Sequence, residues 1–309
     1  MADDENEAVQ DHESPGKRKH RILEEAVLFF KNLKKEDNLR GNVKLQLSLE
    51  NIIKHSMSHG LSSEHINDLM KVIINPHHKL SQGIRTKLVK CLIPCRKVPQ
   101  TAAVLAVLAI SSKIFSSPGP SNLHSILLRW LLLIFDHLEG FDQLHNLYNI
   151  IFTFVNSYLL LPHACHLLFL LTRKHDVKLY KVHQLLELSR KLGPEPCIMG
   201  LLFIYKVYCP HLVTMRLDYS NKVFFKAHDS TWRSTIMDVV SQQQQEPDEG
   251  EKRSATEIAY RRGKERRVQV MSFFLSLSRF LSVQDQTSNT LRTTAALLPF
   301  RELLQYRCD

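Results

Sequence analysis

Glycine and aromatic residues are scarce in this chain. Only 10 of its 309 residues are glycine, aromatic side chains make up 8%, and stretches in which Val, Ile or Thr strictly alternate with polar residues are lacking. Such alternation is the pattern of half-buried β-strands, whereas apolar residues at helical spacing indicate amphipathic helices. Leucine is conspicuous throughout, and hydrophobic residues reach 44%. The composition therefore predicts an all-α protein with ample material for a core.

Long apolar runs are also absent. The longest ones, residues 101–110 and 126–135, fall short of the ~20 residues that a membrane-spanning helix needs, and the second contains Arg129. The sequence therefore predicts no transmembrane segment and no membrane partner.

Regularly spaced cysteines are missing as well. The six cysteines are scattered, which predicts reduced thiols in a cytosolic or nuclear compartment. Cys91 and Cys95 lack the second pair of ligands that a structural zinc site requires. His163 and His166 have a spacing compatible with a metal, but packed or capping histidines on a leucine-rich helix are the stronger interpretation. We therefore expect no metal and no other cofactor.

Catalytic signatures do not occur either. The sequence contains neither a Gly-rich phosphate loop nor a Gly-x-Ser-x-Gly nucleophile elbow. Asp136 and His137 form a nominal triad with Ser125 or Ser157, but a chain with 16 histidines produces such combinations by chance. The sequence predicts a protein that is not an enzyme and has no small-molecule substrate.

What the chain does have is a regular succession of helix breakers. Apolar stretches restart near Asn42, Ser81, Ser121 and Leu161, at intervals of about 40 residues. Periods of this size are typical of stacked helix pairs, each of which needs its neighbours to bury its apolar face. We predict an α-solenoid of antiparallel helix pairs, preceded by a capping helix from Ile22. The predicted pairs are 43–58 with 62–74, 81–93 with 98–115, 122–138 with 141–159, and 162–174 with 179–192, followed by a helix at 195–208.

The two ends differ from this central part in composition. Residues 1–20 are predicted to be a disordered leader, in which six acids are followed by a basic run of nuclear-import type. Residues 21–240 make up the predicted helical-repeat domain. We predict a polar linker at residues 241–253 and a divergent helical tail at residues 254–309. The tail begins with a capping-box pattern.

Positive charge is concentrated in one stretch, because no acidic residue lies between Asp68 and Asp136. Such a field attracts phosphate or an acidic protein face. Because the loops of successive pairs line up along one edge of a repeat array, we predict a basic stripe that contacts DNA phosphate or an acidic partner. A solvated face that only aids solubility is the alternative. The candidate residues are Lys71, Lys79, Arg85, Lys87, Lys90, Arg96, Lys97, Arg173, Lys174, Lys178 and Lys181.

A partner helix is the second kind of ligand that the pattern predicts. The exposed apolar side of an end helix, or the groove between helix pairs, is expected to capture a partner helix or coiled coil.

One block of the chain resembles a known family. The central match is His166-Leu167-Leu168-Phe169-Leu170-Leu171-Thr172-Arg173-Lys174. Further matching residues lie at 90–94, 129–131, 177–178, 185–188, 191–196, 201–202, 205–206 and 222–226. In aggregate, residues 42–240 are similar to centromere protein I.

This resemblance implies a HEAT-like solenoid and a non-enzymatic structural subunit of the inner kinetochore, in the nucleus at the centromere. It implies assembly with centromere proteins H, K and M, and support for loading of the centromeric histone H3 variant and for chromosome segregation. Another nuclear helical-repeat adaptor or nucleic-acid-binding scaffold is the alternative. Family members continue with a long second helical half, so we expect the chain to correspond to the N-terminal half with a divergent or truncated C-terminus.

Overall fold

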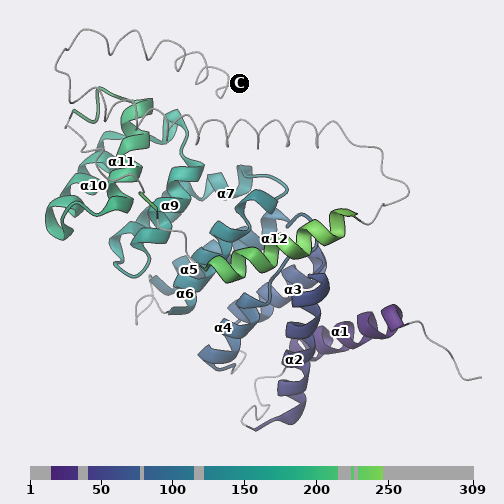
Figure 1. Ribbon diagram of the computed structural model, residues 1–309. Coiled ribbons are helices and arrows are strands. Elements are labelled where there is room, and N and C mark those ends of the chain that lie inside the picture. The colour runs from purple at the N-terminus through teal and green to yellow at the C-terminus, as the bar shows by residue number, and fades with distance from the viewer. Residues whose placement is uncertain are drawn as a thin grey trace, which may run out of the picture. The chain divides into compact units, whose positions relative to one another are not determined.

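The computed structural model describes residues 15–33, 41–76, 80–114, 122–214, 224–225 and 229–245 (Figure 1). The chain divides into two units. The first comprises Met1–Met215 and Phe225–Gly250, and the second comprises Arg216–Phe224 and Glu251–Asp309. Every element described below belongs to the first unit. The predicted tail at 254–309 lies outside the described residues.

All regular elements among these residues are helices, apart from two isolated β-bridges. None of the described helices combines the length and the apolar character needed to cross a bilayer. The α-helices are α1 (Pro15–Lys31), α2 (Val43–His59), α3 (Ser63–Ile74), α4 (Gln82–Lys90), α5 (Gln100–Ile114), α6 (Asn122–Leu133), α7 (Asp142–Asn146), α8 (Tyr148–Thr153), α9 (Leu161–Leu171), α10 (Leu179–Leu192), α11 (Pro196–Tyr208) and α12 (Ser230–Gln245). Three short 3-10 turns are η1 (Phe135–His137), η2 (Phe154–Asn156) and η3 (Lys174–Asp176).

Local chemistry explains where several helices begin and end. The side chains of Asn42, Ser62 and Ser81 accept hydrogen bonds from backbone N–H groups in the first turns of α2, α3 and α4. These caps satisfy donors that have no partner within the helix. Gly60 and Gly193, with φ of 74° and 89°, follow the last residues of α2 and α10. The predicted break between the helices at 43–58 and 62–74 is therefore confirmed.

The helices stack in two layers. In one layer α3 contacts α5, and α5 contacts α7 and α8; in the other, α4 contacts α6, α6 contacts α9, and α9 contacts α11. The extensively packed consecutive helices are α1 with α2, α3 with α4, α5 with α6, α8 with α9, and α10 with α11. The stack of helix pairs is as predicted, but the predicted partners within each pair are wrong by one helix. For example, α3 packs against α4, whereas the sequence analysis paired it with α2. Helix breakers mark the ends of helices and do not say which neighbour covers each apolar face.

Helix α6, which carries most of the apolar run 126–135, lies between other helices. It contacts α4, α5 and α9. Trp130 of α6 is fully buried, and its indole Nε1 donates a hydrogen bond to the carbonyl of Leu92 at 2.8 Å. A buried indole N–H requires such a partner, so this bond fixes α6 against the end of α4.

The boundaries of the repeat domain differ from the prediction at both ends. Helix α1 begins at Pro15, so the basic run predicted as part of a disordered leader lies on its first turns. Pro is favoured at the first helical position, and the pairs His20–Glu24 (3.2 Å) and Arg21–Glu25 (3.9 Å) join successive turns. At the other end, α12 extends to Gln245, five residues into the predicted linker.

Candidate docking edge

Four loops between helices line up along one edge of the stack, which we call the loop edge: residues 60–62, 91–99, 134–141 and 172–178. Backbone hydrogen bonds join the first three. Leu61 N donates to Ile93 O at 2.8 Å, and Cys95 N donates to Leu61 O at 3.1 Å. Val98 N then donates to His137 O at 2.8 Å, and Glu139 N donates to Val98 O at 3.0 Å. The predicted alignment of successive loops is therefore present in the backbone.

Side chains join the third and fourth loops. The Arg173 guanidinium contacts the carboxylate of Asp142 at 3.0 Å, and His145 Nε2 lies 2.8 Å from Asp176 Oδ2. Asp142 and His145 belong to α7, which follows the third loop directly. The side chains of His145 and Asp176 are 10% and 9% exposed, so this second contact lies at the margin of the core.

Seven of the predicted basic residues lie on or next to the loop edge, in two clusters. The proximal cluster consists of Lys87 and Lys90 on the last turn of α4 together with Arg96 and Lys97 in the second loop, all exposed. The distal cluster lies in the fourth loop and consists of Arg173, Lys174 and Lys178.

The stripe is not continuous, because acidic residues separate the two clusters. Asp136, Glu139 and Asp142 are exposed on the third loop and the first turn of α7. One of them, Asp142, pairs with Arg173. The edge therefore presents two positive surfaces divided by a negative one, and a phosphate backbone would be attracted to each cluster separately.

Two further predicted contact residues do not join these clusters. Lys71 lies near the C-terminal end of α3, about 14 Å along the helix from the loop edge, where it pairs with Asp68 at 3.5 Å. The Arg85 guanidinium donates to the carbonyls of Ile73, Asn75 and Leu80 and so holds the end of α3. Burial lowers the pKa of Arg85. Lys79 lies outside the described residues.

Lys181 corrects the prediction most clearly, since its side chain is only 2% exposed. Its Nζ donates to the carbonyl of Asp176 at 3.0 Å and lies 4.4 Å from the centre of the Tyr148 ring. Burial lowers the pKa of Lys181. Helix α10 begins at Leu179 and turns this lysine inward, so it stabilises the core of the stack and does not contact a ligand.

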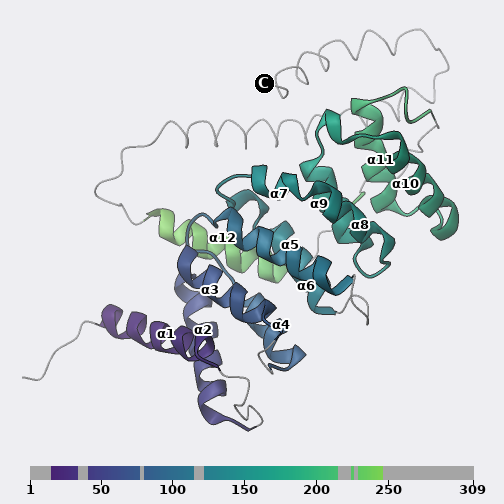
Figure 2. The same ribbon diagram turned by 180° about the vertical axis from the view of Figure 1, so that it is seen from behind.

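Arg129 has a role that the sequence did not indicate. Its guanidinium forms a bidentate ion pair with the carboxylate of Asp229, 100 residues further along the chain. Asp229 has a positive φ of 55° and directly precedes α12. No acidic residue lies close to Arg129 in the sequence, and its partner directly precedes the helix that returns across the stack (Figures 1 and 2).

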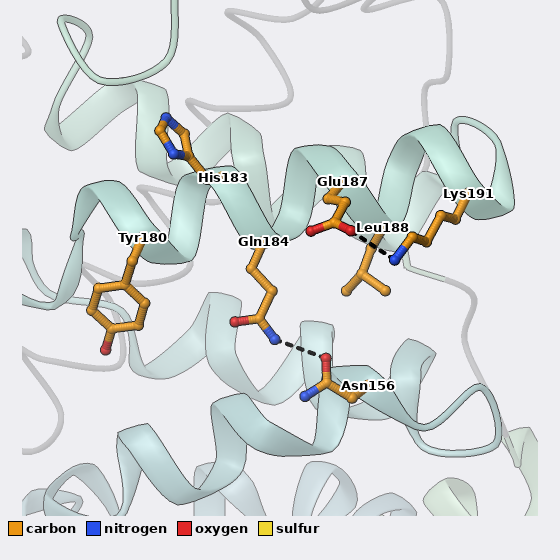
Figure 3. Close-up of a pocket in the computed structure, with 7 residues that line it drawn as sticks. All are labelled: Asn156, Tyr180, His183, Gln184, Glu187, Leu188 and Lys191. Carbon is orange, nitrogen blue, oxygen red and sulfur yellow. Dashed lines mark hydrogen bonds and ion pairs between the residues drawn. The ribbon is translucent and has the colours of Figure 1, made fainter.

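A groove lies between η2 and α10 and is called the α10 groove here (Figure 3). Its volume is about 500 Å³. Gln184 Nε2 donates to Asn156 Oδ1 at 2.7 Å across it, and Lys191 pairs with Glu187 at 2.7 Å. The residues that line it are Asn156, Tyr180, His183, Gln184, Glu187, Leu188 and Lys191.

Two apolar side chains line this groove. Tyr180 is 58% exposed, and Leu188 is half-buried. Exposed aromatic and aliphatic groups with polar groups between them match the two faces of an amphipathic helix. The partner-helix site predicted from the sequence stays a prediction for this groove.

A second cavity, of about 310 Å³, is rich in histidine and lies between α1, α2, α3 and α12. His20, His55, His59 and His65 all line it. Burial, with the neighbouring histidines adding to it, lowers the pKa of His55 to about 4, and burial also lowers that of His65. His55 is therefore neutral at pH 7, so the cavity is less positive than its composition suggests.

Among the described residues, Cys91, His163 and His166, which the sequence analysis considered as possible ligands, are buried or packed against other side chains. Burial raises the pKa of the Cys91 thiol to about 11, so it stays protonated at neutral pH. His166 stacks on Phe225 with ring centres 4.5 Å apart, and His163 is buried. In the part of the chain that the structure describes, the metal-ligating side chains that converge are His145, His175 and Asp176 at the loop edge.

Comparison with known sequences yields consistent matches. The family model of CENP-I (Mis6) matches residues 1–296. Centromere protein I of Gallus gallus is 36% identical over 214 residues, which is 69% of this chain and 28% of that protein. Centromere protein I of Mus musculus is 29% identical over 235 residues, 76% of this chain and 31% of that protein. The inner kinetochore subunit mis6 of Schizosaccharomyces pombe is 28% identical over 233 residues, 72% of this chain and 33% of that protein. The chain therefore spans less than half the length of these relatives.

Comparison with solved structures shows the same fold. A crystal structure of centromere protein Cenp-I has a TM-score of 0.59 and 23% identity, covering 72% of this chain and 99% of that one. A chain in a crystal structure of the Cenp-H/I/K triple complex has a TM-score of 0.59 and 24% identity, covering 73% of this chain and 99% of that one. The HEAT-like helical stack predicted from the sequence is therefore the fold of these neighbours.

Proposed function

Because the chain belongs to the CENP-I (Mis6) family, we propose that it is a non-enzymatic structural subunit of the inner kinetochore that acts at centromeres in the nucleus. The observation that carries this proposal is the family match over residues 1–296. The relatives named above, which include an inner kinetochore subunit, support it. The stack offers a loop edge and a groove as docking surfaces, which suits a scaffold.

The partners of this subunit follow from the same relationship. One solved neighbour is a complex of Cenp-H, Cenp-I and Cenp-K, so we propose that this chain assembles with centromere proteins H and K, and also with M. Within the described residues, the α10 groove is the surface we assign to a helix of protein H or K. Exposed Tyr180 and half-buried Leu188 would supply apolar anchors, and the amide and charged groups of the lining would orient the partner helix.

The two basic clusters are assigned a separate role. We propose that they contact DNA phosphate of centromeric chromatin, with an acidic partner face as the alternative. Seven exposed or partly exposed cations on one edge support this, because phosphate contacts require positive charge and no particular base-reading side chains. As a whole, the subunit would support loading of the centromeric histone H3 variant and chromosome segregation.

Localisation in cells tests the proposed function. The chain is tagged with a fluorescent protein and imaged together with a centromere marker through interphase and mitosis. We expect paired dots that coincide with the marker in both stages. A diffuse nuclear signal, together with failure to recover proteins H and K from the same cells, would contradict the proposal.

A further inference from the structure

Three metal-ligating side chains converge at the loop edge, where α7 meets the fourth loop. His145 comes from α7, and His175 and Asp176 come from η3. Their candidate ligand atoms all lie within 4.8 Å of one another. His145 Nε2 lies 2.8 Å from Asp176 Oδ2, and His175 Nε2 lies 3.6 Å from Asp176 Oδ1. Each imidazole therefore faces a different oxygen of one carboxylate.

The surrounding residues hold this carboxylate in place. The backbone N–H of Arg173 donates to Asp176 Oδ2 at 2.7 Å, which orients the carboxylate in the way that outer hydrogen bonds orient metal ligands. The nearby cations are engaged elsewhere: the Arg173 guanidinium pairs with Asp142, and Lys181 Nζ donates to the backbone carbonyl of Asp176. Both carboxylate oxygens therefore face the histidines.

Two of the three side chains are nearly buried and the third is exposed, as expected for a preformed site that is open to solvent on one side. His145 and Asp176 are 10% and 9% exposed, whereas His175 is 67% exposed. An ion would approach from the His175 side, and small rotations of that ring would complete the ligand set. The ring of His145 also packs against Tyr148, with centres 5.9 Å apart, which restricts its rotation.

We infer that His145, His175 and Asp176 bind one divalent transition-metal ion of the zinc class. Zinc bonds to imidazole nitrogen and carboxylate oxygen are about 2.0 to 2.2 Å long, which places tetrahedral ligand atoms roughly 3.3 Å apart. The observed separations of 2.8 and 3.6 Å lie on either side of that value. Two imidazoles favour zinc over magnesium, which prefers oxygen ligands. Water would occupy the fourth position.

Such an ion would cross-link two neighbouring parts of the stack. Its ligands lie 30 residues apart in the sequence, on α7 and on the loop between α9 and α10. Because metal bound to the folded state stabilises that state, zinc would fix the fourth loop and with it the distal basic cluster. This role requires no reaction and is independent of the proposed kinetochore function.

Zinc binding by the full 309-residue chain tests the inference. Bound equivalents are measured by competition with a chromophoric chelator, and thermal stability is measured with and without zinc. We expect His175→Ala to bind one equivalent fewer than the wild type and to lose the zinc-dependent rise in Tm. His183→Ala, which removes an exposed histidine from α10, is the matched control and should keep both. Magnesium should not raise the Tm of any variant.

Cobalt supplies a spectroscopic measurement that separates this set from other histidines. Cobalt bound by two imidazoles and a carboxylate with an open position should give visible ligand-field absorption in the wild type and in His183→Ala. His175→Ala should lose it. Asp176→Asn keeps an oxygen acceptor for the Arg173 N–H. It should lower the affinity for the metal while the chain stays folded. Equal zinc equivalents and equal cobalt spectra in the wild type and His175→Ala would overturn the inference.

Discussion

Among single residues, Gly60 shows most directly how one position fixes the loop edge. Its φ of 74° and ψ of −180° describe a backbone that essentially only glycine adopts. A Cβ there would lie 2.8 Å from both Cys95 N and Val239 Cγ1. Gly60 therefore lets the second loop and α12 approach the end of α2.

Replacing Gly60 with alanine tests this role. We expect Gly60→Ala to lower the free energy of unfolding by roughly 3 kcal/mol or more, since backbone strain and overpacking add. The measurement is chemical denaturation followed by circular dichroism. The control is Gly83→Ala in α4, where a Cβ meets only Ser81 Oγ at 4.0 Å. It should be neutral or stabilising by up to about 1 kcal/mol. Similar losses in both variants would contradict this account.

The basic residues show what can and cannot be predicted at this scale. Residue type alone placed Lys87, Lys90 and Arg96 correctly on an exposed surface. It gave no sign that Lys181 is buried beside Tyr148, or that Arg85 holds the end of a helix, because side-chain direction depends on where each helix begins and on which neighbour packs there. Nothing in the sequence near Arg129 or Asp229 indicates that these two residues, 100 positions apart, form an ion pair.

At the scale of elements, α12 differs from the repeats because it crosses them. Val239 and Val240 pack against Ile93 at one end, and the ion pair of Arg129 with Asp229 fixes the other. Its contacts reach α2, the second helix of the chain. Helix α12 therefore joins segments that are more than 100 residues apart in the sequence.

Breaking the ion pair tests the docking of α12. Arg129→Ala and Asp229→Ala should each destabilise the fold by about 1 to 2 kcal/mol, because a partly buried charge loses its hydrogen-bonded partner. In hydrogen exchange, amides of α12 should lose more protection than amides of α9. Asp238→Asn, which changes an exposed acid on the same helix, should have no effect. Equal protection of α12 in all three variants would count against the role of the pair.

The proximal cluster supports a prediction about salt dependence. Reversing the charge of Lys87, Lys90, Arg96 and Lys97 together should weaken binding to duplex DNA. The slope of log affinity against log salt should fall by about 3 to 4, since each phosphate contact releases counterions. Four reversals away from the loop edge, at Lys44, Lys54, Lys71 and Arg190, form the control and should leave the slope nearly unchanged. Equal effects of both sets would refute phosphate contact by this cluster, as would the absence of any effect.

Much of the element structure could be predicted because helix ends have local chemistry. Gly60 follows the end of α2 and Ser62 caps α3, in agreement with the boundary predicted between residues 58 and 62. The pairing of helices could not be predicted, because α5 is apolar on most sides and gives no preference between α4 and α6. The α10 groove was anticipated only as a type of surface, since its position depends on how η2 and α10 come together.

For the whole molecule, fold and function have different support. The all-α repeat stack follows from periodicity and is matched by solved structures with a TM-score of 0.59. Composition and periodicity predict a helical scaffold with charged and apolar docking surfaces, whereas only the family resemblance implies the kinetochore. The chain spans 28% of its Gallus gallus relative, so the proposed assembly concerns the surfaces that this part of the family carries.

The most direct measurement of the central claim is the binding of centromere proteins H and K to this chain. Purified H–K complex is titrated into the full chain, and mass and affinity are measured by light scattering and calorimetry. We predict a stoichiometric complex whose affinity falls at least tenfold in the double variant Tyr180→Glu with Leu188→Glu, since a charge in the α10 groove displaces the partner helix. Arg190→Glu on the same helix should bind as the wild type does. If the wild-type chain forms no complex with H and K, the account is contradicted; if the double variant binds like the wild type, the assignment of the α10 groove is wrong.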